Sequence, residues 1–459
     1  MKASFKKALA IVLMLVSLLS LFVGCGDGKM YESDGFKYKV YSKHVELLEY
    51  VGEGGDVKIP SKLKGKAVTK LGEGLFKNRS NIKSVEIADS ITEIGAEAFS
   101  HCTALVVVEV PEGVKTLGTG VFSFCTTLRA VSLPSTVSVL PDNAFYQALS
   151  LETVQLAEGL LEIKPYAFFS CEALSEISIP QSTVVLGEFA FCKCSSLKTV
   201  KLSDCVKTVG DNCFDECSNL IEFSAGTGLE TIGDKAFIKC PKLAKVTLNN
   251  GLKKIGALAF SGAALSEISF PDSVTEIGDE CLSQCSKLNT AQLPENITVL
   301  SNGLFSGCKA LESIEIPENV TAVGNKTFYC CESLAAPKIP EGLVMVGDYA
   351  FAQCVKIDKL VFTDALKSVG DCAFASCVSL SEIQLGNGLT TVGAGAFELC
   401  WTIRYITLPA TVNKVGDGAF RSCSYLRLIT VKKEKDSLDT SNWGKGFNVK
   451  WQPETQDKK

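Results

Sequence analysis

The chain has 459 residues, of which 46% are apolar and 21% are charged, so it is long enough for several globular domains or one long repeat array. Its net charge of −5 lacks the strong basic excess that is typical of nucleic-acid-binding proteins. The two histidines, His44 and His101, leave little material for histidine-based catalysis or metal binding.

Residues 1–24 have the pattern of an export signal. Three lysines precede an apolar run over residues 8–23, which ends at Gly24 and Cys25. A basic start, an apolar middle and a small residue before the cleavage point are typical of secretory signals. Because a cysteine follows that small residue, the segment resembles a bacterial lipoprotein signal, although Phe22 stands where that pattern prefers leucine.

That resemblance implies that Cys25 is the lipidated first residue of the mature chain and anchors it to a membrane. Two acyl chains are sufficient for stable anchoring, whereas one is marginal. An ordinary secretory signal before an incidental cysteine and an uncleaved membrane anchor remain as alternatives. Removal of residues 1–24 would leave 43 basic and 51 acidic side chains, a net charge of −8.

Two short segments follow the signal. Residues 25–35, which begin with Gly26 and Gly28 close to Cys25, are predicted to be a flexible tether. Residues 36–69 are predicted to be an N-terminal cap, because apolar side chains such as Tyr38 and Leu47 alternate with polar ones over residues 36–60. This alternation is typical of a β-hairpin.

A 23-residue repeat fills residues 70–431. Successive copies of one aromatic position are 23 residues apart, except for one step of 22 between Phe260 and Leu282. Glycine lies four residues before this position and cysteine three residues after it, each in thirteen of the sixteen copies. The sixteen residues that mark the copies are Phe76, Phe99, Phe122, Phe145, Phe168, Phe191, Phe214, Phe237, Phe260, Leu282, Phe305, Phe328, Phe351, Phe374, Phe397 and Phe420.

Each copy predicts one coil of a solenoid. Alternation at Ile177 and Ile179 indicates a short half-buried strand that Pro180 ends. A second apolar pair, such as Ile91 and Ile94, indicates an extended return leg before a glycine that permits the turn. The Ala-Phe-x-x-Cys segment has the spacing of one face of a helical turn. One coil cannot bury its apolar side chains alone, whereas stacked coils can.

The cycle Ile-x-x-Ile-Gly-x-x-Ala-Phe-x-x-Cys-x-x-Leu-x-x-Ile-x-Ile-Pro resembles the leucine-rich repeat of BspA-like bacterial surface proteins over about four fifths of the chain. The chain lacks the asparagine ladder of the commoner leucine-rich repeats, which fits this subtype. The resemblance implies a curved, right-handed solenoid of about sixteen coils, β-rich with short helical turns, whose concave face is lined by parallel strands. It also implies surface exposure and adhesion to host or neighbouring-cell proteins.

Residues 432–459 are predicted to be a C-terminal cap and tail. Trp443, Phe447 and Trp451 stand in a polar segment after the last copy, where they can cover the end of the core. Solenoids need such capping because the last coil has no neighbour on one side.

Thirteen of the 20 cysteines occupy one repeat position and are predicted to be buried thiols. Neighbouring coils would hold their Cβ atoms about 4.8 Å apart, whereas disulfides prefer about 3.5–4.5 Å. Cys213 and Cys281 add a second cysteine at helical spacing, but no histidine lies near to complete a metal site. We therefore predict packing there and no metal. A bond within one pair stays open for the cysteines outside the pattern, which are Cys192, Cys205, Cys330 and Cys372.

No catalytic residue, cofactor or enzyme activity is predicted. The chain contains no nucleophile elbow, phosphate-binding glycine loop or zinc-binding His-Glu-x-x-His helix. Aspartates that follow a glycine, such as Asp211 and Asp348, recur with the repeat and are interpreted as turn residues rather than calcium ligands. His101 is predicted to lie on an exposed turn.

The outward strand positions, eight and ten residues after each mark, form the candidate ligand surface. Binding hot spots usually centre on Tyr, Trp or Arg, so a single aromatic here favours weak, extended or multivalent contact. Simple solvation of a sheet face is the alternative. The candidate residues on this concave face are Glu109, Glu176, Lys201, Glu222, Lys245, Glu267, Glu315, Lys338, Lys359, Glu382 and Tyr405.

These features predict an exported, lipid-anchored binding protein of the cell surface, with extracellular protein or glycan ligands and no nucleic-acid partner. A passive spacer of the cell envelope is the alternative. A carbohydrate hydrolase of the envelope is a third and weaker alternative, because the even spacing of the copies leaves no room for a catalytic insertion.

Overall fold

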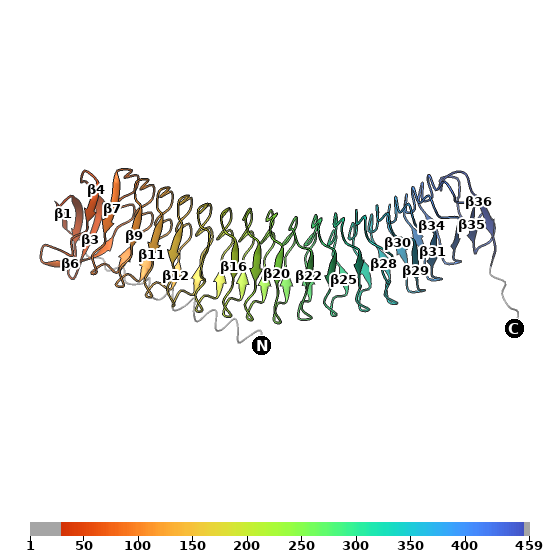
Figure 1. Ribbon diagram of the computed structural model, residues 1–459, viewed down its shortest axis with the longest axis horizontal. Helices are drawn as coiled ribbons and strands as arrows, with labels where there is room; N and C mark the ends of the chain where they lie inside the picture. The colour runs from red at the N-terminus through yellow and green to blue at the C-terminus, as the bar shows by residue number, and fades with distance from the viewer. Residues whose placement is uncertain (1–28, 454–459) are drawn as a thin grey trace.

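The computed structural model describes residues 29–453, which form one elongated, shallowly curved array of stacked coils (Figure 1). Within these residues there are 36 strands and no helix. The array has about eighteen turns of parallel β-solenoid. The predicted solenoid is therefore confirmed, and the segments at both ends supply the turns beyond the sixteen copies. The predicted signal and Cys25 lie outside the described residues.

A first row of strands, which we call the strand face, contains one strand from most coils. Strands pair in parallel and in register within groups of two or three, so that Glu222 lies opposite Lys245. The strand predicted at Ile177 and Ile179 is absent, so the row is interrupted there, and it is reduced to a single bridge between Glu315 and Lys338. Its strands are β7 (Ile82–Glu86), β9 (Val107–Glu109), β11 (Ala130–Ser132), β13 (Thr153–Gln155), β16 (Thr199–Lys201), β18 (Glu222–Ser224), β20 (Lys245–Thr247), β22 (Glu267–Ser269), β24 (Thr290–Gln292), β26 (Ser313–Ile314), β29 (Lys359–Phe362), β31 (Glu382–Leu385), β33 (Tyr405–Leu408) and β35 (Leu428–Val431).

A second row consists of two-residue strands just before the repeat glycine, where the sequence indicates a return leg. These strands also pair in parallel, as Val139 and Leu140 do with Glu162 and Ile163. They are β8 (Glu93–Ile94), β10 (Thr116–Leu117), β12 (Val139–Leu140), β14 (Glu162–Ile163), β15 (Val185–Leu186), β17 (Thr208–Val209), β19 (Thr231–Ile232), β21 (Lys254–Ile255), β23 (Glu276–Ile277), β25 (Val299–Leu300), β27 (Ala322–Val323), β28 (Met345–Val346), β30 (Ser368–Val369), β32 (Thr391–Val392) and β34 (Lys414–Val415).

The Ala-Phe-x-x-Cys segment is not the short helical turn that its spacing suggests. The N–H groups of Ser100 and Cys102 donate to the carbonyls of Glu97 and Phe99, three residues back, as in consecutive β-turns. Glu97 and His101 have left-handed φ angles of 51° and 60°, which end any helical run. The N–H of Phe99 donates to the next coil instead of to its own turn. Hydrogen bonds between coils therefore replace the helical ones.

The repeat glycine is required by close approach, and not by the turn geometry expected from the sequence. Gly233 has no left-handed φ, but a Cβ atom on it would lie 2.6 Å from the backbone N of Asp211 in the preceding coil. Gly210 and Gly187 meet the preceding coil in the same way. Glycine thus allows a close approach that a Cβ atom would obstruct without a local shift, although Pro141, Lys164 and Ser301 occupy the position in three copies.

The core is a stack of phenylalanine rings along the array. Consecutive rings from Phe76 to Phe260 and from Phe305 to Phe420 have centroids 5.0–5.6 Å apart and lie within 21° of parallel. The stack is interrupted only where Leu282 replaces the ring. All sixteen marking residues are fully buried, so the inward direction predicted for them is correct.

The N-terminal end begins with three antiparallel strands, β1 (Lys29–Ser33), β2 (Phe36–Val40) and β3 (Val45–Tyr50). The prediction of a flexible tether is wrong for residues 29–33, because Tyr31 of β1 stacks on Tyr38 with centroids 5.8 Å apart. Strands β4 (Gly55–Lys58), β5 (Lys62–Leu63) and β6 (Lys66–Leu71) follow. Parallel pairing of β3 with β6 and of β4 with β7 joins this end to the repeat.

The C-terminal end continues the strand face by one more strand. Strand β36 (Asn448–Trp451) pairs in parallel with β35. Trp443 is buried and packs edge-on against Phe420, with centroids 6.1 Å apart. It thus occupies the place of the next ring in the core stack.

Candidate functional site

The strand face presents the predicted ligand-binding residues to solvent. In β29, for example, Lys359 and Val361 are exposed, whereas Leu360 and Phe362 are buried. All eleven candidate residues lie at such outward positions; ten are exposed and Glu222 is half-buried. They come from coils along most of the array and do not converge on one site.

Several candidate charges are paired with one another across neighbouring coils. The Lys245 ammonium lies 2.8 Å from the Glu222 carboxylate, and Lys359 lies 2.9 Å from Glu382. The hydrogen bond from Lys359 holds the pKa of the Glu382 carboxyl below its ordinary value. Exposed pairs of this kind add little to stability, because water and salt screen them. A charged ligand could therefore displace either partner at little cost.

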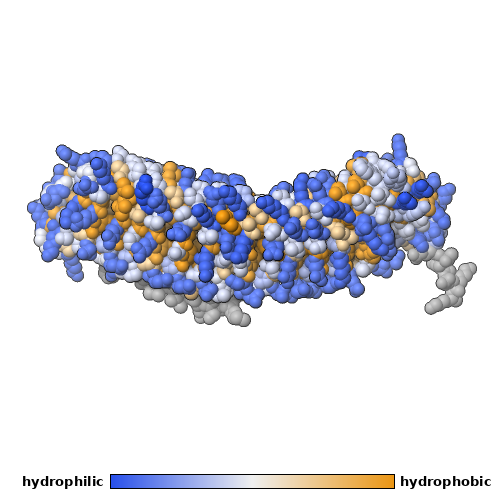
Figure 2. Space-filling view, in the orientation of Figure 1, coloured by the Kyte–Doolittle hydropathy of each residue, from blue (hydrophilic) through white to orange (hydrophobic). Residues whose placement is uncertain are grey.

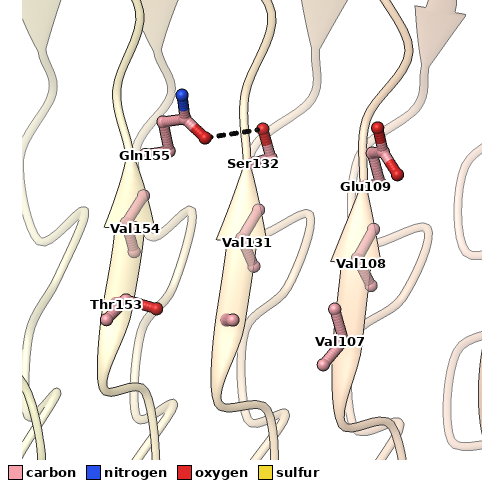
Figure 3. A pocket seen from close by; sticks show the side chains of 9 residues that line it. Val107, Val108, Glu109, Val131, Ser132, Thr153, Val154 and Gln155 are labelled. Carbon is pink, nitrogen blue, oxygen red and sulfur yellow. Dashed lines mark hydrogen bonds between the residues drawn. The ribbon is translucent and has the colours of Figure 1, made fainter.

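A shallow depression lies on the strand face over β9, β11 and β13 (Figure 3). Its floor is apolar, because Val107 is 54% exposed and the neighbouring outward residue is Ala130. On one side Ser132 donates a hydrogen bond to Gln155 (Oγ to Oε1, 3.4 Å). Figure 2 likewise shows apolar residues along the middle of the visible surface, between edges that are mainly polar. The depression can accept a small apolar group but contains no catalytic arrangement.

A cluster of aromatic and arginine side chains near the C-terminal end was largely missed by the sequence analysis. We call it the aromatic–arginine patch, and it consists of Trp401, Arg404, Tyr405, Tyr425 and Arg427, all of them exposed. Only Tyr405 was predicted, because Trp401 and Tyr425 precede the strands and fall outside the alternating positions. One signal was available: no other copy carries an aromatic residue four or five places after its mark.

The repeat cysteines have a structural role. The Sγ atom of each of the thirteen lies 3.0–3.3 Å from the carbonyl oxygen of the marking residue in the preceding coil. Burial raises the pKa of the Cys377 thiol to about 12, so it stays protonated and can donate. Every cysteine of residues 29–453 is a free thiol, including the four outside the pattern.

The recurring aspartates form a hydrogen-bonded ladder. Asp211 accepts from the backbone N–H of Asp234, and Asp348 accepts from that of Asp371, each at 2.8 Å. In residues 29–453 no three His, Cys, Asp or Glu side chains are grouped as metal ligands. His101 lies on a turn as predicted, but it is half-buried rather than exposed, because it stacks on Phe124 with centroids 4.3 Å apart. A search of the same residues for a helix long and apolar enough to span a bilayer finds none.

Comparisons with known proteins agree with this architecture. The family model described as BspA type leucine rich repeat region (6 copies) matches residues 56–172, 138–263, 230–357 and 344–444. A crystal structure of a leucine-rich repeat protein from Bacteroides ovatus is 24% identical, with a TM-score of 0.70, over 92% of this chain and 99% of that chain. A leucine-rich cell surface protein from Faecalibacterium prausnitzii is 20% identical, with a TM-score of 0.37, over 94% and 96% of the two chains. No curated protein matches the sequence. The chain belongs to the BspA-type leucine-rich-repeat family.

Proposed function

We propose that the protein is a cell-surface binding protein that recognises macromolecules of host or neighbouring cells through its strand face. The observation that carries this proposal is the long row of exposed side chains from β7 to β36, in register within each group of paired strands, which offers an extended contact surface. Membership of this repeat family is consistent with surface binding or recognition. Solenoids of this kind are typically binding scaffolds without enzyme activity.

Anchoring through Cys25 is part of the same proposal and is supported by the basic start, the apolar run and the cysteine after Gly24. With Cys25→Ala we expect the protein to lose its lipid and move from the membrane fraction to the soluble fraction. Incorporation of a fatty-acid analogue and cell fractionation measure this. Membrane retention of the variant, with the analogue still incorporated, would contradict anchoring at Cys25.

The binding experiment uses the full chain and measures its attachment to intact cells, matrix proteins and glycans. Charge reversal of three acidic residues of the strand face, Glu176→Lys, Glu222→Lys and Glu267→Lys, should weaken attachment about tenfold or more, since central interface residues dominate binding energy. A matched variant reverses three exposed acids on the turn side of the coils: Glu73→Lys, Glu188→Lys and Glu280→Lys.

The control variant should bind as the native chain does. Equal loss in both variants would indicate a non-specific charge effect and would contradict the strand-face assignment. A passive envelope spacer is the second candidate, favoured by the mutual pairing of Lys245 with Glu222 and of Lys359 with Glu382. Failure of the native chain to attach to any surface would support the spacer.

A further inference from the structure

We propose that the aromatic–arginine patch binds a polysaccharide whose sugars carry carboxylate groups, that is, a chain of uronic acids. This inference rests on the proposed surface-binding function and names one ligand class and its place on the strand face. Its support comes from the charges of Arg404 and Arg427, the open rings around them and the neutral polar side chains beside them.

The two arginines occupy equivalent positions in neighbouring coils without an acidic partner. The backbone N–H of Arg427 donates to the carbonyl of Arg404 at 3.0 Å, so the two side chains start from adjacent rungs. Among the described residues neither arginine takes part in an ion pair. In another pair of neighbouring coils, the same position is occupied by Arg129 and Glu152, and the Arg129 guanidinium lies 3.0 Å from the Glu152 carboxylate. Adjacent like charges destabilise a sheet, and a bound anion would relieve the repulsion.

The surroundings of the patch strengthen its attraction for polyanions. Residues 401–453 hold nine basic and four acidic side chains, whereas the whole chain has a net charge of −5. Residues 401–453 therefore carry a net charge of +5, whereas the rest of the chain taken together carries −10. A local field of this kind draws extended anions toward the C-terminal end and orients them. Arginine also matches a carboxylate with two parallel hydrogen bonds.

The aromatic side chains of the patch have free ring faces. Trp401, Tyr405 and Tyr425 are 48%, 61% and 60% exposed, and none of them stacks on another aromatic ring of the described chain. Trp401 and Tyr425 start from adjacent coils, since the N–H of Tyr425 donates to the carbonyl of Trp401 at 3.2 Å. Tyr405 begins β33 of the same pair of coils, opposite Leu428. The C–H groups of a sugar ring pack on the negative face of an aromatic ring. Three open faces beside two arginines thus suit a ring that bears a carboxylate.

The neighbouring strand positions supply neutral hydrogen-bonding groups. Thr407 of β33 is exposed in the outward row and Thr430 of β35 lies opposite it, whereas the amide of Gln384 in β31 donates to the Glu382 carboxylate at 3.1 Å. Hydroxyl and amide groups can both donate to and accept from sugar hydroxyls. A protein hot spot usually fills a desolvated pocket. All five patch residues are exposed, so this open platform favours a chain of rings over a protein side chain.

The test measures binding of the full chain to immobilised polymers. Polygalacturonate is the uronate probe, dextran the neutral polysaccharide, dextran sulfate the sulfated one and polyglutamate the carboxylate without rings. We expect polygalacturonate to bind most tightly, with an affinity that falls as salt rises. Each of two double variants, Arg404→Gln with Arg427→Gln and Trp401→Ala with Tyr425→Ala, should weaken it about tenfold or more. The control Lys83→Gln with Lys198→Gln, at equivalent positions of other coils, should leave it within about twofold.

Several outcomes would overturn the assignment. Equal binding of polyglutamate would show that the patch does not recognise sugar rings. Preference for dextran sulfate would show that the recognised anion is not a carboxylate. Full binding by the tryptophan–tyrosine variant, or no binding of polygalacturonate by the native chain, would also reject it. If polygalacturonate does not bind but cell attachment persists and still depends on Glu176, Glu222 and Glu267, the uronate inference fails while the proposed function stands. Circular dichroism of each variant confirms that the fold is intact.

Discussion

The cysteine three residues after each ring meets two requirements at once. The position is fully enclosed, as at Cys354, and an S–H group can donate to the carbonyl of the preceding coil, 3.1 Å away. In the first copy Arg79 stands at the cysteine position, and its guanidinium supplies the hydrogen bond to the carbonyl of Tyr50. The sequence predicts a small buried residue here, but the donor role depends on a contact between coils that spacing alone does not show.

Thiol reactivity should follow burial. In the native chain we expect an alkylating reagent to modify Cys205, which is exposed, rapidly and Cys330 and Cys372, which are half-buried, more slowly. The buried thiols should react only after denaturation, because burial raises their pKa and excludes the reagent, as for Cys377 with a pKa of about 12. Mass spectrometry of labelled peptides measures this. Rapid native labelling of Cys377 would contradict the buried ladder.

The aspartate ladder allows a test at one rung. Asp348 accepts the N–H of Asp371 at 2.8 Å and donates its own N–H to Asn325 at 2.7 Å. Asp348→Ala removes one acceptor and should lower the free energy of unfolding by about 0.5–1.5 kcal/mol. Asp348→Asn keeps an acceptor oxygen and serves as the control. Urea unfolding measures both, and equal stability of the alanine variant and the native chain would reject a stabilising ladder.

At the scale of elements, alternation and the 23-residue spacing placed both rows of strands, except at Ile177 and Ile179, and indicated which apolar side chains are buried. The turn segment could not be assigned from sequence, because Ala, Phe and Cys share one face in a helical turn and in consecutive β-turns alike. Hydrogen bonds to the next coil decide between the two. Strand β1 was missed for a related reason: its single inward contact, Tyr31 on Tyr38, is visible only once the hairpin is formed.

The ring stack should tolerate leucine better than alanine. Phe214 lies between Phe191 and Phe237, with centroids 5.3 and 5.2 Å away. Phe214→Ala should cost about 3–5 kcal/mol because it leaves a cavity in a closely packed core. Phe214→Leu should cost less, since Leu282 fills the same position without a ring. Thermal and urea unfolding measure the order, and a leucine variant as unstable as the alanine variant would contradict it.

At the scale of the whole molecule, the candidate site was harder to predict than the fold. The repeat defines which strand positions face outward, and all eleven predicted residues lie there. Pairing such as Lys359 with Glu382 depends on which coils are neighbours in register, and Trp401 and Tyr425 project from turns that the alternation does not cover. Periodicity describes what the copies share, whereas a binding patch arises where one or two copies differ.

The solenoid makes a prediction for the shape in solution. About eighteen turns at about 4.8 Å give a length on the order of 90 Å. A compact protein of 459 residues would have a radius of gyration of about 23 Å and a diameter of roughly 60 Å. Small-angle X-ray scattering of the full chain should therefore show a maximum dimension of about 90 Å or more. A value near that of a compact sphere would contradict the extended array.

Because each coil contacts only its neighbours, the length of the array can change by whole coils. Duplication or deletion of one whole coil would move the aromatic–arginine patch relative to the N-terminal end by about 4.8 Å and leave both ends chemically unchanged. The array also accommodates the single 22-residue step, because the thiol of Cys285 still donates a hydrogen bond to the carbonyl of Phe260. A chain with a different number of coils would thus place the same side chains at a different distance from its N-terminal end.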